Sequence, residues 1–168
     1  MSRTVRIKGP SRIVGELKMP GDKSISHRVA MLASIAKGRS TITGFASSAD
    51  CHSTLNCVES LGVPVVREPD RLTIHGRGLW GWRPRKMPVT LDAGNSGSTI
   101  RMLTGLLAGQ EFGSFVDGDG SLKRRPMNRI IEPLRSMGAE IKAAGENYPP
   151  LRIRGSALRG IDYQSPVA

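Results

Sequence analysis

Side chains able to bind anions are concentrated in one short segment near the start of the sequence, residues 20–28 (PGDKSISHR). A glycine turn, two serine hydroxyls, Lys23 and Arg28 stand directly before an apolar helix expected over Val29–Ala36. Backbone N–H groups at a helix start favour anions, and lysine and arginine add full charges and further donors. The segment therefore predicts a binding site for a phosphate or carboxylate group. The structural alternative is a turn with a serine N-cap, in which Lys23 and Arg28 are simply solvated.

A second segment, residues 91–101 (LDAGNSGSTIR), repeats this arrangement. A strand again enters a turn rich in glycine and hydroxyl groups, Arg101 lies in the first helical turn, and an apolar helix is expected over Met102–Ala108. This helix is expected to end at Gly109, as the first one ends at Gly38. Two helix starts of the same anion-binding type, in equivalent places, predict that both converge on one site.

The elements that position these two segments also recur, at an offset of about 75 residues that exceeds a solenoid repeat. The equivalent pairs are strands over 40–45 and 113–118, helices over 53–61 and 126–137, and strands over 72–76 and 151–155. We therefore predict an α/β (α+β) fold made of repeated β-α-β-α-β-β units. A purely structural duplication is the alternative, and the recurrence of the charged turn argues against it.

The repeat divides the sequence into four parts. These are residues 1–18 with two short strands over 4–9 and 12–18, a first unit over 19–78, a second unit over 79–159, and a tail over 160–168. The tail resembles the opening strand of a third cycle and stops where the third helix would begin. The chain is therefore expected to be cut short within a larger protein.

Three residues carry more local predictions about the helices. Asp50 is expected to be an N-cap, because its carboxylate can accept a hydrogen bond from a free N–H in the first turn. Pro126 suits the first position of its helix, where no N–H is needed. Pro133 lies inside that same helix and is expected to kink it.

The charge balance points to acidic partners, because 25 Lys and Arg against 14 Asp and Glu give a net charge of +11. Small phosphorylated metabolites, nucleic acid and anionic surfaces all fit such a charge. Aromatic residues make up only 4% of the chain, so the stacking platforms that hold single-stranded nucleic acid are poorly supplied. The longest basic run, residues 123–125, is short. We therefore expect small anionic ligands and no nucleic acid.

Cys51 and Cys57 lack the spacing of a zinc site or a redox pair, so we expect no metal and a reducing cytoplasmic location. No apolar run approaches the length of a membrane span, and no signal or transit peptide precedes the first apolar alternation. Membrane association is therefore not expected.

Three motifs carry a resemblance to a known family: residues 21–28 (GDKSISHR), 94–101 (GNSGSTIR) and 119–127 (DGSLKRRPM). In this order they resemble the N-terminal part of the 5-enolpyruvylshikimate-3-phosphate synthase (EPSP synthase) family, and the resemblance covers essentially the whole chain. It implies an inside-out barrel of two domains with three units each, of which this chain holds two units. It further implies transfer of the enolpyruvyl group of phosphoenolpyruvate to the 5-hydroxyl of shikimate 3-phosphate. Phosphate is released, and neither a metal nor an organic cofactor is used.

The resemblance also implies roles for individual residues. Lys23 would be the catalytic residue in contact with both substrates. Shikimate 3-phosphate would be held by Lys23, Ser24 and Arg28. Phosphoenolpyruvate would be held by Lys23, Asn95, Gly97 and Arg125. Glyphosate competes for the phosphoenolpyruvate pocket in this family; Gly97 is typical of sensitive members, whereas Met102 replaces a common proline and leaves the response to the inhibitor open.

Several expectations concern what the sequence lacks. A third-unit phosphate site of the Ser-Ala-Gln type has no counterpart, and neither do the acidic and basic groups that the family carries in its second domain. We expect the chain to hold half an active site, to be inactive alone, and to require the C-terminal portion of the same enzyme as partner. Residues 1–18 are expected to pair with that second domain.

Three alternatives remain open at this point. A UDP-N-acetylglucosamine enolpyruvyl transferase shares the fold, but it would show Lys-Asn where this chain has Lys23-Ser24, together with a loop cysteine. A basic module that binds phosphate or nucleic acid would satisfy the charge alone. A non-catalytic remnant would bind shikimate 3-phosphate without turning it over.

Overall fold

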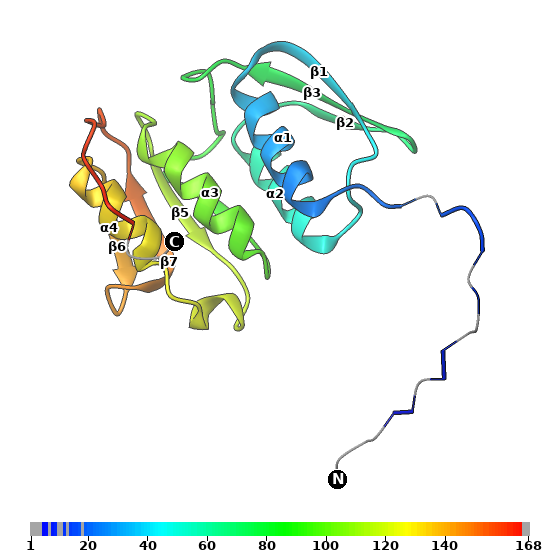
Figure 1. Ribbon diagram of the computed structural model, residues 1–168. Coiled ribbons are helices and arrows are strands. Elements are labelled where there is room, and N and C mark those ends of the chain that lie inside the picture. The colour runs from blue at the N-terminus through cyan, green and yellow to red at the C-terminus, as the bar shows by residue number, and fades with distance from the viewer. Residues whose placement is uncertain (1–4, 7, 10–11, 13, 18, 166–168) are drawn as a thin grey trace.

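The computed structural model describes residues 5–6, 8–9, 12, 14–17 and 19–165, and it consists of two α/β units side by side (Figure 1). The first unit contains α1 (Lys23–Ile35), β1 (Lys37–Thr43), α2 (Ala49–Ser60), β2 (Val65–Arg67) and β3 (Arg71–Arg77). The second contains β4 (Val89–Asp92), α3 (Gly97–Ala108), β5 (Gly113–Asp117), a 3₁₀ turn (Leu122–Arg124), α4 (Asn128–Ser136), β6 (Glu140–Ala144) and β7 (Tyr148–Arg154). The mixed α/β class and the β-α-β-α-β-β order of the second unit are confirmed.

The two sheets show why the units are equivalent. The first sheet has the strand order β1-β3-β2, with every pairing antiparallel. The second has the order β4-β5-β7-β6, in which β5, β7 and β6 repeat that pattern and β4 adds a parallel strand beside β5. No described strand occupies the corresponding edge of β1, so the first sheet keeps one row of backbone groups unpaired.

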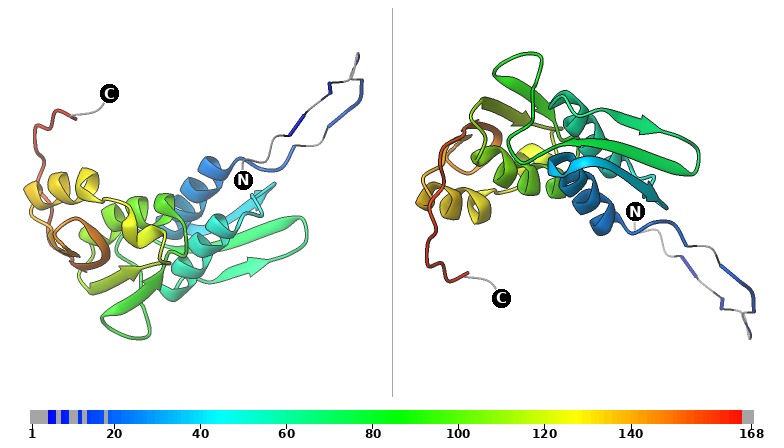
Figure 2. Two further views of the ribbon diagram at one scale, coloured as in Figure 1. Left: turned by 90° about the horizontal axis from the view of Figure 1, so that it is seen from below. Right: turned by 90° about the horizontal axis from the view of Figure 1, so that it is seen from above.

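The strands expected over residues 4–9 and 12–18 are not formed by the described residues of that stretch, which are 5–6, 8–9, 12 and 14–17. The other positions of these two strands lie outside the described residues. The described part leads away from the two units (Figure 2). Its apolar side chains are exposed: Val5 by 71%, Val14 by 78% and Leu17 by 86%. Since a lone segment has no sheet to join, its alternating pattern alone does not produce a strand.

Helices α1 and α3 begin earlier than their apolar runs indicate. Helix α1 starts at Lys23 rather than Val29, because the Asp22 carboxylate accepts a hydrogen bond from the N–H of Ile25 at 2.7 Å. Helix α3 starts at Gly97 rather than Met102 and is capped by Ser96, whose hydroxyl accepts from the N–H of Thr99. The polar residues of both motifs therefore lie in first helical turns.

The local predictions for the other two helices also need correction. The N-cap of α2 is Ser48 and not Asp50, which lies in the first turn. Helix α4 begins only at Asn128, so Pro126 precedes the helix instead of opening it. The side-chain oxygen of Asn147 accepts from the N–H groups of Met127 and Asn128 and so takes the place of a local cap. Pro133 does lie inside α4.

One hydrophobic core runs through both units, because α1, α2 and α3 pack against one another between the two sheets. The link between the units takes part in this core. Trp82 is fully buried, whereas Trp80 keeps 57% of its surface exposed. Gly62, just after the C-terminal end of α2, lies against the link. Its φ is 84°, and a Cβ there would stand 2.3 Å from the carbonyl oxygen of Arg83. Only glycine permits this close passage of the link.

Trp82→Ala should destabilise the chain by about 3–5 kcal/mol, because it opens a large cavity where the units meet. Trp80→Ala is the matched control and should change stability by no more than about 0.5 kcal/mol. Urea unfolding followed by circular dichroism measures both effects. Equal losses in the two variants would contradict the placement of Trp82 in the shared core.

Candidate functional site

The first turn of α1 carries three of the predicted site residues. The ammonium of Lys23 forms an ion pair with the carboxylate of Asp50 on α2, and the Lys23 side chain keeps 52% of its surface exposed. Ser24 and Arg28 are exposed on the same helix. Arg28 donates from Nη1 to the carbonyl oxygen of Ser24 at 3.1 Å, which holds the guanidinium near the helix start. This surface combines cations with the positive end of a helix.

The turn before α3 holds a second set of polar groups in a fixed orientation. The Nδ2 atom of Asn95 donates to Asp119 Oδ2 at 2.6 Å, and Asn95 Oδ1 accepts from Arg125 Nη2 at 2.6 Å. Asp119 also accepts from the N–H groups of Ser121 and Leu122. The hydrogen bond from Asn95, followed by that from Leu122, lowers the pKa of Asp119. Its carboxylate therefore stays ionised and organises the loop that presents Arg125.

Gly97 allows two guanidinium groups to approach the backbone at the start of α3. A Cβ at this position would lie 2.6 Å from Arg101 Nη1 and 3.3 Å from Arg125 Nη1. Arg101 donates to the carbonyl oxygens of Gly97 at 3.4 Å and of Pro126 at 3.1 Å. Burial, followed by the charges of Arg125 and Arg129, lowers the pKa of Arg101. None of these three arginines has a carboxylate ion-pair partner among the described residues.

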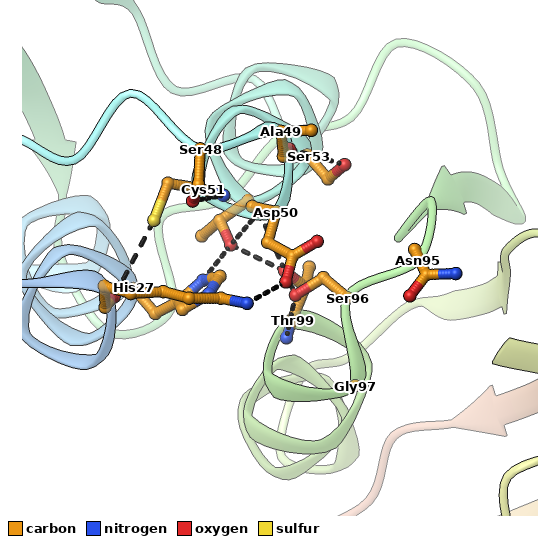
Figure 3. Close-up of polar contacts among 12 residues, drawn as sticks. His27, Ser48, Ala49, Asp50, Cys51, Ser53, Asn95, Ser96, Gly97 and Thr99 are labelled. Carbon is orange, nitrogen blue, oxygen red and sulfur yellow. Dashed lines mark hydrogen bonds and ion pairs between the residues drawn. The ribbon is translucent and has the colours of Figure 1, made fainter. Parts of the chain in front are cut away.

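Helix α2 lies between these two groups of residues and connects them (Figure 3). The side chain of Asp50 reaches Lys23, while the Oγ1 atom of Thr99 lies 3.4 Å from the Asp50 carbonyl oxygen. Asn95, Gly97 and Arg125 thus form one direct cluster. Among the described residues, Lys23 has no polar contact with it, and is linked to α3 only by way of Asp50, whose carbonyl oxygen contacts Thr99. Ser24 and Arg28 line the α1 side and have no hydrogen bond to that cluster in the described structure.

Sequence reasoning assigned no site role to Asp50 or Arg129, and it included Arg101 in the second anion-binding motif without assigning it a ligand. For Arg101 a signal existed, because an arginine follows the polar turn in both motifs. Asp50 was interpreted only as a cap, and its contact with Lys23 joins residues on different helices. Arg129 belongs to the site because its charge helps to lower the pKa of Arg101. The spacing of residues in the sequence does not reveal this proximity.

Neither cysteine belongs to the exposed, charged part of this site, although the Cys51 thiol donates to the carbonyl oxygen of Lys23 at 3.7 Å. Both are buried and free, and burial, with a smaller effect of Asp92, raises the pKa of the Cys57 thiol to about 12. Across the described residues, no group of three His, Cys, Asp or Glu side chains is arranged to hold a metal ion. None of the helices found there is long and apolar enough to cross a membrane. Fixed cations beside helix starts are groups of the type that can bind small anions.

Fold and site together define a class: a repeated-unit α/β protein with two adjacent cationic helix starts of the type that can bind phosphate or carboxylate groups. Comparison with known proteins gives the particular family. Residues 7–168 match the family described as EPSP synthase (3-phosphoshikimate 1-carboxyvinyltransferase). The chain belongs to the EPSP synthase family.

Individual relatives agree with this assignment. The 3-phosphoshikimate 1-carboxyvinyltransferase of Solibacter usitatus is 54% identical over 163 residues, which are 96% of this chain and 38% of that protein. The protein of the same name from Koribacter versatilis is 49% identical over 165 residues, 98% of this chain and 38% of its own length. A solved structure of EPSP synthase from Acinetobacter baumannii superposes with a TM-score of 0.85 at 42% identity, covering 92% of this chain and 35% of that one. The chain thus spans somewhat more than a third of each relative.

Asp119→Asn tests the loop that orients Asn95 and Arg125. The folded pKa of Asp119 lies below its ordinary value of 3.8, so its contribution to stability is complete above that value and is lost as the pH falls through the lowered pKa. We expect the unfolding midpoint of the wild type to fall more steeply over this acid range than that of the variant. Urea unfolding at a series of pH values measures the difference.

Glu111→Gln is the control for Asp119→Asn, because it removes an exposed carboxylate that has no ion pair among the described residues. The dependence of the unfolding midpoint on pH in this acid range should be the same for this variant as for the wild type. If Asp119→Asn kept the wild-type slope as well, the ionised Asp119 would not be holding the loop.

Proposed function

We propose that this chain supplies one half of an active site that transfers the enolpyruvyl group of phosphoenolpyruvate to the 5-hydroxyl of shikimate 3-phosphate, with release of phosphate. The observation that carries the proposal is the junction of two cationic helix starts across α2. Both substrates are phosphorylated, and phosphoenolpyruvate adds a carboxylate. Bringing them together confines several negative charges, which a cleft rich in unpaired cations can accommodate.

The assignment of substrates follows the two sides of this junction. Shikimate 3-phosphate would lie on the α1 side, at Lys23, Ser24 and Arg28, all of which are exposed there. Phosphoenolpyruvate would lie on the α3 side, where Asn95 and Arg125 are already hydrogen bonded to each other. Lys23 would contact both ligands, since its partner Asp50 is in the helix that separates them.

The phosphoenolpyruvate side has two further supporting features. The absence of a Cβ at Gly97 lets the guanidinium groups of Arg101 and Arg125 come close to the start of α3, where both could donate to one anion. Arg101 adds a cation that the predicted residue set did not include. A bound carboxylate or phosphate would reduce the mutual repulsion of Arg101, Arg125 and Arg129.

The same cations serve the chemical step. Attack of the 5-hydroxyl oxygen on C2 of phosphoenolpyruvate would form a carbon–oxygen bond while the hydroxyl loses its proton and C3 of the former double bond gains one. The resulting intermediate keeps the phosphate and carboxylate charges. It would then lose phosphate from C2 and a proton from C3, which restores the double bond. Donors fixed before the reaction stabilise this charge without having to reorganise, and Lys23 and Arg125 would be such donors. Holding the two ligands side by side lowers the entropic part of the barrier as well.

The remaining part of the active site would come from the portion of its relatives that this chain does not span, so the chain alone would be inactive. Residues 1–18 would pair with that portion. The exposed apolar side chains Val5, Val14 and Leu17 support this pairing, because they have no packing partner within the two units. The C-terminal portion of the same enzyme is therefore the proposed macromolecular partner, in a cytoplasmic biosynthetic enzyme.

The alternatives find less support. Both named relatives are 3-phosphoshikimate 1-carboxyvinyltransferases, which favours this reaction over transfer to a UDP-sugar. Nucleic acid binding would use a basic surface with aromatic platforms, whereas aromatic residues make up only 4% of this chain.

Phosphate release is the direct test. Residues 1–168 should release no phosphate from shikimate 3-phosphate and phosphoenolpyruvate when assayed alone. A full-length chimera, in which they replace the matching segment of the Solibacter usitatus relative, should release phosphate only when both substrates are present. Turnover by the chain alone would refute the half-site proposal, and an inactive, folded chimera would refute the assigned reaction.

Lys23→Met in the same chimera should lower kcat/KM by about 10²–10³-fold, the usual loss for one fixed donor to transition-state charge. Stability should change little, because the Lys23–Asp50 pair is partly exposed. Lys142→Met on β6 is the control, since it removes an exposed cation from outside the site. Near-normal turnover by the Lys23 variant would remove Lys23 from the site.

A further inference from the structure

A buried chain of polar side chains runs beneath the two helix starts and joins α1, α2 and α3 (Figure 3). The Nδ1 atom of His27 lies 2.6 Å from Thr54 Oγ1, and Thr54 Oγ1 lies 2.7 Å from Thr99 Oγ1. Thr99 Oγ1 in turn donates to Ser96 Oγ at 2.7 Å. All four residues are completely buried. A direct polar path therefore connects one helix start to the other.

The hydrogen bonds fix the direction of this chain. A hydroxyl has a single hydrogen, so Thr99, which donates to Ser96, must accept from Thr54. Thr54 therefore has no hydrogen left for His27, and the Nδ1–H of His27 must be the donor. The contacts of Thr54 and Thr99 with the carbonyl oxygen of Asp50 are longer, at 3.4 Å each. His27 is thus held as one tautomer.

The surroundings of His27 require it to be neutral. Its Nε2 atom is buried without a hydrogen-bond partner in the described structure, so a second proton there would be an unsatisfied donor. Burial lowers the pKa of His27, and the charges of Lys23 and Arg28 lower it further against the opposing charge of Asp50. A neutral imidazole can donate at Nδ1 while its Nε2 lone pair stays unprotonated.

The hydrogen-bonded network joins the three helices whose first turns form the junction. His27 lies one turn beyond Lys23 on α1, and Thr54 lies one turn beyond Asp50 on α2. Ser96 caps α3 and stands between Asn95 and Gly97 in the sequence. A shift of any one of these helices would break a buried hydrogen bond, so the network defines how far apart the two helix starts are.

We propose that His27, Thr54 and Thr99 form a positioning network that sets the spacing between the two anion-binding helix starts and so aligns the two ligands. This inference rests on the proposed function. The three residues are buried and do not reach a ligand, so they act through Lys23, Asn95 and Gly97. Apolar side chains could fill the same space, but they would allow several packing arrangements of the helices. A buried polar network with all its hydrogen bonds formed permits only one arrangement.

Kinetics of variants in the full-length chimera test this role. His27→Ala and Thr99→Val should each lower kcat by about 10²-fold, the effect of a misplacement of roughly 1 Å between reactants. Binding of shikimate 3-phosphate alone, measured by calorimetry, should change less than threefold, because its residues lie on α1 only. The double variant His27→Ala, Thr99→Val should lose less kcat than the product of the two single losses, since both substitutions interrupt the same hydrogen-bond network.

Conservative variants separate positioning from simple stability. His27→Asn keeps an N–H donor near Thr54, and Thr99→Ser keeps the hydroxyl, so both should recover most of the wild-type kcat. His52→Ala is the matched control, an exposed histidine of α2 outside the network. All assays run below the melting temperature of each variant. A variant too unstable for assay is replaced by its conservative counterpart, whose failure to retain kcat would count against the network.

Three results would overturn the inference. Folded His27→Ala and Thr99→Val chimeras with wild-type kcat would show that the network does not align the ligands. A neutral His27 imidazole with its proton on Nε2 instead of Nδ1, detected by ¹⁵N NMR of residues 1–168, would contradict the hydrogen-bond direction. A wild-type chimera without turnover would refute the proposed function and this inference with it, and it is distinguished by failing before any substitution is made.

Discussion

The structure depends on holding several positive charges close together without their own counter-ions. Arg101, Arg125 and Arg129 lie near enough for the charges of the other two to lower the pKa of Arg101, and no described carboxylate pairs with them. Such a cluster repels itself, so its geometry must be enforced by bonds elsewhere. Asn95 and backbone carbonyl oxygens provide that restraint without cancelling the charge. The anionic ligand proposed above would be the favourable partner that neutralises the cluster.

Each of the two units positions its polar helix start in the same way. In each unit a capped helix directs its first N–H groups toward the junction, with Asp22 as the cap in one and Ser96 in the other. Helix α2 then acts as the spacer, because its first turn contacts both α1 and α3. The two sheets lie on opposite sides of these helices and bury their apolar faces in one core (Figure 1). Rigidity of the site thus comes from the core that the two units share.

The sequence alone was sufficient for the repeat and for the residues of each motif, because glycine turns, hydroxyls and basic residues mark helix starts locally. It placed the helices α1 and α3 too late, since apolar runs reveal the buried face and not the capped polar turn before it. It interpreted Asp50 as a cap, although Ser48 takes that role. It also gave no role to His27, because hydrogen bonds between separate helices depend on packing that no local pattern encodes.

The Lys23–Asp50 ion pair explains how such a site can be stable in the absence of ligand. An exposed ion pair contributes little to stability, so its formation does not commit Lys23 to Asp50. The pair still supplies one negative charge to a region otherwise dominated by cations. An incoming phosphate brings more charge and more acceptor oxygens than a carboxylate, and it can therefore compete for Lys23 while Asp50 stays anchored by α2. The buried hydroxyls below would keep their arrangement during this exchange, because their hydrogen bonds involve the Asp50 backbone and not its side chain.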